Sequence, residues 1–529
     1  MRRTSVAVVS VAALFSSLLA LTFVVVPLDD RPVTAQLPRL LGAIAGVRVV
    51  EPPRALLGRY LVPGDSAAIM RWLREEAPRD ARAYVVSNDM IVYGGLVASR
   101  IPGTPRAVAY TRLQDLAAFR ATRGDASFAV FGTVMRLAPT GVPKLGSAAT
   151  FPFAGGDVWA PIQQYANLPD PPQTDEQRAL AATLRAQLGP ALDAYLDTRA
   201  RDREVDLFAL RVAAEGGFDK IVIGQDDAGP VGLHLRDLAA LRAFAAHWLP
   251  PSRASIEPGA DELGMVLVAA ALARAANDVP RVRVVYSRPD GSSVEDPLEF
   301  APIATTIGDL IRSCGAVQVT GPFPADVDLF VRVPQTRDAD EVKFVTAIDH
   351  DAARAPGRPD PPTAVAVADL SFLAANDYAG QRRLMQDLVI RRLAGRVDAF
   401  ASWNTVANTV GTALPEAIAV RAGRLMGTYD ARANATFTFM RYVDDVAFHA
   451  DVRPLLNADL SAQGIDDHTL LLPDTAQRVA SENRALLWPE GLDLLAQIAP
   501  QFRDAGFTIT LPWDRTFETE LDVRLAPRR

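Results

Sequence analysis

Two pairs of acidic residues lie at the ends of apolar segments, where carboxylates can carry out acid–base chemistry. The β-branched run 221–223 is followed at once by a polar turn that contains Asp226 and Asp227. A second pair, Asp261 and Glu262, comes directly before an apolar helical segment. Two carboxyl groups across a cleft act as proton donor and as base or nucleophile in most glycoside hydrolases. We therefore predict these four acids as catalytic residues, exposed at the rim of a sheet.

Helix capping is the alternative explanation for these acids. Aspartate is favoured at helix N-termini for backbone reasons alone, and Asp226 and Asp261 both precede helical patterns. Capping accounts for any single acid as well as catalysis does. It does not require doubled acids after several successive strands, so the set as a whole favours a functional site.

Other polar and aromatic side chains follow predicted strands in the same way and are expected to bind substrate. Asn, Arg and His side chains can bind sugar hydroxyls, and an indole can form a platform for a sugar ring. The predicted substrate-binding residues are Asp29, Asp30, Arg31, Asp89, Tyr93, Arg100, Arg136, Gln225, His234, Trp403, Asn404 and Asn408.

The same acids are also suited to bind a hard cation. Mg²⁺, Mn²⁺ and Ca²⁺ prefer oxygen ligands, so a metal-dependent hydrolase using Mg²⁺ or Mn²⁺ is the runner-up. Zinc is disfavoured because the five histidines show no HxxxH or HxH spacing and Cys314 is the single cysteine. His449, flanked by apolar residues, is expected to be a packed or surface histidine. No cofactor is expected under the leading hypothesis, since no nucleotide-binding glycine motif occurs.

Apolar runs that alternate with helical patterns position these residues. Such alternation predicts βαβ units with parallel pairing, hence an α/β protein with mainly parallel strands in two lobes. An eight-stranded (β/α)8 barrel with an inserted subdomain is the alternative. The expected strands are 23–26, 47–50, 83–86, 128–131, 221–223, 282–286, 317–320, 328–333, 364–367, 399–402 and 507–511.

A change in composition near residue 280 suggests the domain organisation. We expect a signal peptide or anchor at 1–21, an N-terminal α/β domain carrying the acids at 22–280, a second α/β lobe at 281–430 and a C-terminal α/β extension at 431–529. Segment 138–173 is expected to be a long loop over the strand ends. Segment 255–262 is expected to be an acidic turn, and 335–362 a polar excursion.

The net charge of the chain indicates which partners it can bind, and its N-terminal segment indicates where in the cell the protein is found. A formal net charge of −7 disfavours a nucleic-acid partner, so a small molecule or glycan is the expected substrate. Arg2 and Arg3 precede an uncharged apolar run, which is typical of a secretory signal peptide and predicts a periplasmic or extracellular protein. An uncleaved membrane anchor is the alternative, because the apolar run continues past Ala20.

Several blocks of the sequence resemble a large bacterial family that is catalogued only as a domain of unknown function. These blocks are PLDDRP at 27–32, YGGLVASR at 93–100, WNTVANTVG at 403–411, and the segments around Asp226, Asp261 and Asp444-Asp445. The resemblance covers nearly the whole chain from Phe23 onward. It implies family membership and no particular chemistry. The Asp444-Asp445 pair is interpreted either as a helix start or as one wall of the cleft.

Taken together, the sequence favours an exported hydrolase that acts on a carbohydrate-like substrate through paired carboxylates. Two other hypotheses stay open: the metal-dependent hydrolase of another ester or amide, and a non-catalytic exported binding protein built from two lobes. A binding protein does not need closely spaced acids.

The prediction of export can be tested at the N-terminus of the protein. If segment 2–20 is a cleaved signal, the mature protein should begin near Leu21, as Edman or mass-spectrometric sequencing of the secreted form would show. Recovery of the chain in a membrane fraction with Met1 retained would instead support the anchor.

Overall fold

A computed structural model describes residues 21–139, 156–321, 323–353, 361–373, 378–465 and 470–528. The segment on which the prediction of export depends, residues 1–20, lies outside the described residues. Within the described ranges, none of the helices combines the length and the apolar character needed to cross a bilayer.

Six apolar strands of the N-terminal half form one parallel sheet in the order β2–β1–β3–β4–β5–β6. Every residue of the interior strand β1 is buried, as expected for a parallel sheet that helices cover on both faces. The strands are β1 (Thr22–Val26), β2 (Arg48–Val50), β3 (Ala83–Ser87), β4 (Ser127–Val134), β5 (Lys220–Gln225) and β6 (Ala254–Pro258).

A second parallel sheet of five strands, in the order β11–β10–β9–β7–β8, follows from residue 281. Its order places the first strand between later ones, as the first sheet does, which is the doubly wound arrangement with ligand sites outside the carboxyl ends of the strands. The strands are β7 (Arg281–Tyr286), β8 (Val317–Val319), β9 (Val327–Arg332), β10 (Ala364–Asp369) and β11 (Ala399–Ala401).

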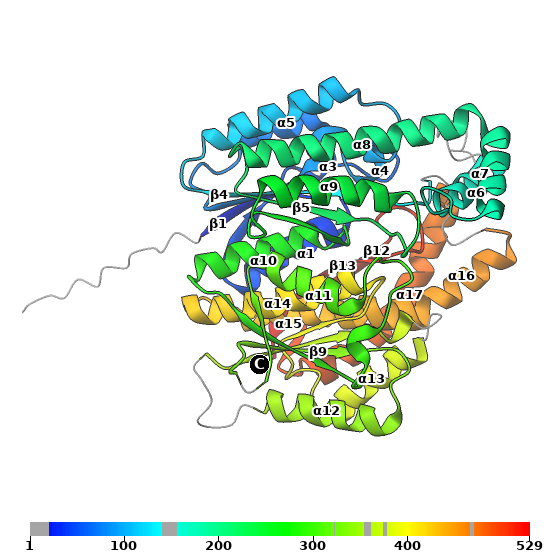
Figure 1. The fold of residues 1–529 in the computed structure, drawn as a ribbon. Helices are drawn as coiled ribbons and strands as arrows, with labels where there is room; N and C mark the ends of the chain where they lie inside the picture. Colours follow the sequence, from blue (N-terminus) through cyan, green and yellow to red (C-terminus); the bar gives the residue numbers. More distant parts are fainter. Residues whose placement is uncertain are drawn as a thin grey trace, which may run out of the picture.

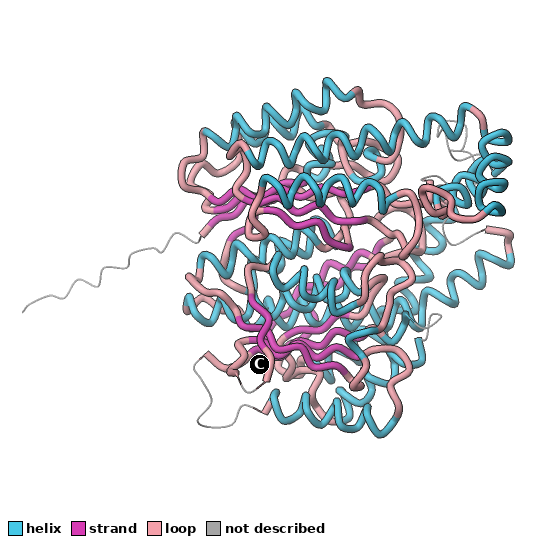
Figure 2. The backbone as a smooth tube through the Cα atoms, in the orientation of Figure 1, coloured by secondary structure: helices cyan, strands magenta, loops and turns pink. Residues whose placement is uncertain are grey.

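Helices separate and cover the two sheets, so that the molecule is layered (Figures 1 and 2). The outer layer above the first sheet includes α5, α8 and α9, and α12 and α13 cover the far face of the second sheet. The helices before β7 are α1 (Leu37–Ile44), α2 (Ser66–Glu75), α3 (Asn88–Tyr93), α4 (Leu96–Ser99), α5 (Arg106–Ala121), α6 (Gly156–Ala166), α7 (Asp175–Leu188), α8 (Pro190–Ala214), α9 (His234–Trp248) and α10 (Leu263–Ala275). Those between β7 and residue 426 are α11 (Ile303–Ser313), α12 (Asp338–Ala352), α13 (Tyr378–Ile390) and α14 (Val406–Met426).

The layer between the sheets joins the two lobes through one continuous hydrophobic core. Helices α1, α10 and α14 pack against one another there, and α14 also packs on β10 and β11. From Val406 to Gly423 every residue of α14 is buried. A helix buried on all sides is expected in the interior of a large protein, and here it fixes the lobes against each other.

The C-terminal extension packs beside both lobes and ends in an antiparallel hairpin. It comprises α15 (Ala431–Arg441), the π-helix η6 (Tyr442–Val452), α16 (Arg453–Ala462), α17 (Pro473–Ile498), β12 (Phe502–Thr510) and β13 (Glu520–Pro527). The hairpin loop, residues 511–519, reaches back to the end of β1, where Trp513 Nε1 donates to Asp30 Oδ1 at 2.6 Å.

The α/β class with mainly parallel strands in two lobes is confirmed, whereas the alternative of a closed barrel is wrong because both sheets are open. Three segments differ from expectation. Segment 255–262 contains the edge strand β6, and segment 138–173 contains α6. Segment 335–362 contains α12, whose first turn holds Asp338, Asp340 and Glu341. Acids are favourable at a helix N-terminus, so the aspartates that suggested a loop begin a helix.

The contact between α10 and α14 depends on a glycine, which a mutation can test. A Cβ on Gly411 would lie 2.8 Å from Glu262 Cβ, so Gly411→Ala should destabilise the protein by about 1–3 kcal/mol through overpacking. Gly308→Ala in α11 is the matched control, because its nearest neighbour would be 3.6 Å away and the helix should gain up to about 1 kcal/mol. Urea unfolding midpoints measure both changes. Equal midpoints for the two variants would contradict the packing.

Candidate active site

Arg31, which follows β1, joins the ends of two distant strands and the hairpin loop. Its guanidinium donates to both carboxylate oxygens of Asp29, with Nη2–Oδ2 at 2.7 Å, and to both of Asp261, with Nη2–Oδ1 at 2.6 Å. Its plane lies over the Trp513 ring, 4.6 Å from the centroid. Paired forks of this kind are the strongest and most directional of the ion pairs.

The ionisation of Arg31 is maintained by these partners. Burial alone lowers the pKa of Arg31, but Asp261 and Asp29 outweigh burial and hold the pKa well above its usual value. Arg31 therefore stays charged in the folded protein, and the two acids compensate one buried cation. Asp29 and Asp261 therefore each have Arg31 as a partner.

The neighbouring strands β3, β4 and β5 bring further charged groups to the same edge. Arg100, just after α4, forms a buried ion pair with Asp226, which follows β5. Asp227 is half-buried, and burial together with the charge of Asp226 raises its pKa to about 7. Arg136, which follows β4, lies within electrostatic range of both acids. Asp29, Asp89, Asp226 and Asp261 thus converge at one sheet edge, as their positions after successive strands predict.

Behind this edge lies a layer of buried polar groups. Asp89 accepts a hydrogen bond from Thr133 Oγ1 at 3.1 Å, and burial and Asp202 raise its pKa well above the usual range. The ring of Tyr93 packs under the guanidinium of Arg201, and burial raises the pKa of its hydroxyl. Asp89 and Tyr93, both predicted to bind substrate, are buried. They pack beneath the sheet edge instead of facing open space.

Three other predicted residues also serve the packing around the strand ends. Asp30 accepts hydrogen bonds from Trp513 and Arg54, and its pKa is raised by burial. The Gln225 amide donates to the backbone oxygen of Asp226 at 2.6 Å. His234, at the start of α9, is completely buried, and burial lowers its pKa to about 4, so it is neutral.

Glu262 and Asn408 are paired inside the molecule, between α10 and α14. Asn408 Nδ2 donates to Glu262 Oε2 at 2.7 Å, and Asn404 Nδ2 in turn donates to Asn408 Oδ1 at 2.6 Å. Glu262 has no exposed surface, and burial raises its pKa well above the usual range. Only Asn404 of these three borders open space, where it lines the cavity described next.

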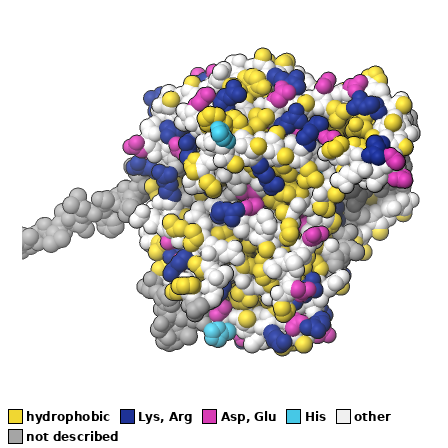
Figure 3. Space-filling view, viewed as in Figure 1, with side chains coloured by type: hydrophobic (Ala, Val, Ile, Leu, Met, Phe, Trp, Pro, Cys, Tyr) yellow, Lys and Arg dark blue, Asp and Glu magenta, His cyan; other side chains and the backbone are white. Residues whose placement is uncertain are grey.

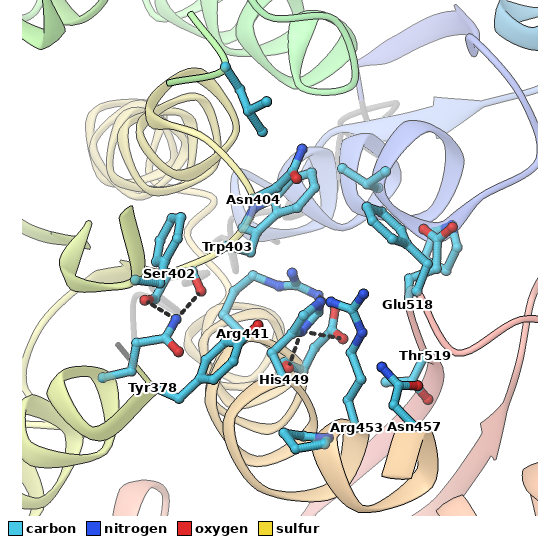
Figure 4. Close-up of a pocket in the computed structure, with 18 residues that line it drawn as sticks. Tyr378, Ser402, Trp403, Asn404, Arg441, His449, Arg453, Asn457, Glu518 and Thr519 are labelled. Carbon is cyan, nitrogen blue, oxygen red and sulfur yellow. Dashed lines mark hydrogen bonds and ion pairs between the residues drawn. The ribbon is translucent and has the colours of Figure 1, made fainter. Parts of the chain in front are cut away.

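A cavity of about 520 Å³ opens between the carboxyl edges of the two sheets and the C-terminal extension (Figure 4). Trp403 and Asn404, directly after β11, form one wall, with Glu518 and Thr519 of the hairpin on another side. Hydrogen bonding from Trp403 Nε1 to Thr412 Oγ1 at 3.1 Å fixes the indole. The remaining lining residues are Pro32, Val33, Leu298, Phe372, Tyr378, Gln381, Ser402, Arg441, Asp444, His449, Arg453, Pro454, Asn457 and Phe517.

The floor of the cavity is formed by the π-helix η6 and the start of α16. Arg441 binds Asp444 at 3.0 Å and Asp445 at 2.8 Å, and Asp445 accepts from the backbone of Ser402 at 2.7 Å. π-helical turns often occur at functional sites, because they turn side chains away from α-helical positions. Asp444 thus forms part of a wall of the cavity. His449 is largely buried, as expected for a packed histidine, and it also lines this cavity.

Glu518 connects the cavity to the charged edge of the first sheet. It lines the cavity, accepts from Arg515 Nη2 at 3.2 Å, and lies within electrostatic range of Arg31 and Asp261. Burial raises its pKa to about 7, against the opposing effect of the two arginines. The backbone oxygen of Leu298, another lining residue, accepts from Ala228 at 2.9 Å, so the cavity wall also contacts the segment after Asp227.

Sequence reasoning missed the contribution of the hairpin loop, which supplies Trp513, Arg515 and Glu518. The available signal was two aromatic residues, Trp513 and Phe517, interleaved with charges in a short polar segment. The expectation of exposed catalytic acids is also wrong for Asp226 and Glu262, whose exposed fractions are 5% and 0%, whereas Asp227 and Asp261 are half-buried. Arg100 covers Asp226 and Asn408 covers Glu262, and a one-dimensional pattern does not reveal such partners.

The acids pair with guanidinium groups rather than with one another. Asp29 and Asp261 share Arg31, and Asp226 pairs with Arg100. Throughout the described ranges, no three His, Cys, Asp or Glu side chains come together in an arrangement suited to a metal ion. A cation at Asp29, Asp226 or Asp261 would have to displace an arginine from the carboxylate.

Comparison with known proteins gives one match. A family model described as "Protein of unknown function (DUF4127)" matches residues 23–522, nearly the whole chain, which confirms the resemblance seen in the sequence blocks. No curated protein and no solved structure matches the sequence.

The role of Arg31 can be measured through stability. Arg31→Ala would leave Asp29 and Asp261 buried without their cation, so the free energy of unfolding should fall by about 3–5 kcal/mol. Arg59→Ala is the matched control, because Arg59 pairs with Asp514 at 3.5 Å on the exposed surface and should cost no more than about 1 kcal/mol. Chemical denaturation of both variants decides the matter. A loss of less than 1 kcal/mol for Arg31→Ala would contradict the proposed junction.

Proposed function

We propose that this chain, which belongs to the DUF4127 family of proteins of unknown function, is an exported hydrolase that acts on a carbohydrate-like substrate. The observation that carries the proposal is a pair of carboxyl groups, Asp227 and Glu518, which both lie within electrostatic range of Asp261 and whose pKa values burial raises to about 7. Groups that titrate near the working pH are the most effective general acids and bases.

The surroundings of the two acids suggest how they divide the roles. Asp227 lies beside Asp226, whose negative charge favours the protonated form of Asp227. Glu518 lies beside Arg31 and Arg515, which favour its ionised form. We therefore assign Asp227 as proton donor to the leaving group and Glu518 as base or nucleophile. Asp226 and Asp261, originally expected to be catalytic, would position arginines.

The cavity has the composition expected for a polyhydroxylated ligand. Trp403, Tyr378 and Phe517 offer aromatic faces, and Asn404 and Asn457 offer amides that can bind hydroxyl groups. On the face visible in Figure 3, basic side chains are interspersed with acidic ones, a distribution unlike the basic stripe of a phosphate-backbone-binding surface. These features support a small-molecule or glycan substrate.

Two other functions give different results in the same assays. A metal-dependent hydrolase using Mg²⁺ or Mn²⁺ would lose activity with chelator and regain it with excess cation. A binding protein of two lobes would show no turnover, and variants of the acids would change affinity alone. The pairing of the edge acids with arginines favours the metal-independent mechanism.

Asp227→Asn and Glu518→Gln should each lower turnover by about 10²–10⁴ on a panel of aryl glycosides and oligosaccharides, because each removes one proton-transfer group. Since the donor must be protonated and the base ionised, kcat/KM of the wild type should fall on either side of pH 7. Asp227→Asn should abolish the fall above pH 7. Asp514→Asn, at an exposed position of the same hairpin loop, is the control. Wild-type turnover in both acid variants would end the proposal.

A further inference from the structure

We propose that Arg100, Arg136 and Arg515 form a subsite that binds an anionic substituent of the substrate, a carboxylate, sulfate or phosphate group. The inference rests on the proposed function and extends it by naming the class of sugar: an acidic rather than a neutral one. It concerns the edge of the first sheet next to Asp227, outside the lining of the cavity itself.

Adjacent structural elements bring the three guanidinium groups together. Arg100 follows α4 and pairs with Asp226, whose backbone N–H donates to Val134 at the end of β4, two residues before Arg136. Arg515 comes from the hairpin loop. Arg136 lies within electrostatic range of both other arginines, and burial and Arg100 lower its pKa. Asp226 and Asp227 offset part of the repulsion among the three arginines, and a bound anion would offset more of it.

Arg136 differs from the other two arginines in its partners. Arg100 is engaged with Asp226, and Arg515 with Glu518. In the described part of the chain, Arg136 forms no ion pair; its Nε donates to the backbone oxygen of Ala138 at 3.2 Å. A fork of guanidinium donors matches the geometry of carboxylate, sulfate and phosphate groups.

The position of Arg136 connects the subsite to the reacting groups. It lies within electrostatic range of Asp227, the assigned proton donor, and the backbone after Asp227 bonds to Leu298 in the cavity wall. A sugar whose ring occupies the cavity near Trp403 can thus direct an acidic substituent toward Arg136. The aromatic wall would recognise the ring, and the arginines its charge.

Direct binding measurements test the subsite without requiring turnover. Calorimetric titration of the whole protein with glucuronate, glucose 6-phosphate, inorganic phosphate and glucose should show binding of the anions and at least tenfold weaker binding of glucose. Comparison of the two acidic sugars with inorganic phosphate separates an acidic sugar from a free anion as the ligand. Arg136→Gln should weaken binding of the anions about tenfold or more, as expected for loss of a charge-assisted pair.

Two variants complete the test. Arg136→Lys retains charge and should retain part of the affinity, and Arg59→Gln, an exposed arginine, should leave it unchanged. If Arg136→Gln fails to fold by circular dichroism, the Lys variant decides, and affinity equal to wild type in it overturns the role of the guanidinium fork. Absence of anion binding by the wild type, or equal binding by Arg136→Gln, overturns the subsite. Failure of Asp227→Asn to lower turnover would overturn the catalytic proposal and leave this binding result standing.

Discussion

The double fork of Arg31 is the interaction on which the arrangement of the site depends. One guanidinium holds Asp29 at the end of β1, Asp261 beyond β6 and the ring of Trp513 from the hairpin loop. The two strands stand four positions apart in the sheet, so no backbone pairing could fix these segments against one another. Because the group is buried, loss of Arg31 would leave two carboxylates without their cation, so the positions of all three segments depend on this one side chain.

The apolar contacts that join the two lobes and the charged side chains of the site lie in different parts of the molecule. The helices α1, α10 and α14 fuse two doubly wound lobes through an apolar layer, and both carboxyl edges then border the same cavity. The apolar layer can tolerate little movement, since interiors are close-packed. Charged side chains gather at the strand ends, where loops can change without disturbing the core.

Most of the strands, their parallel arrangement and the convergence of the strand-end acids could be predicted, because β-branched runs such as 221–223 and the polar turns after them are local signals. The edge strand β6 and the hairpin strand β13 were missed. The burial of Glu262 against Asn408 could not, since those residues are 146 positions apart. The same holds for Glu518, which reaches the site through a hairpin whose partners lie near residue 31. The π-helix η6 was missed because its turns are set by packing, while its sequence has an ordinary helical composition.

The hairpin loop has a consequence for biosynthesis. Chains emerge from the ribosome N-terminus first and their domains tend to fold in that order, so the first sheet can form while residues 511–519 are still being made. During that interval Arg31 has its two carboxylates but lacks the indole of Trp513, and the cavity lacks the wall formed by Glu518 and Thr519. The last hairpin to be synthesised therefore completes both the surroundings of Arg31 and the wall of the cavity.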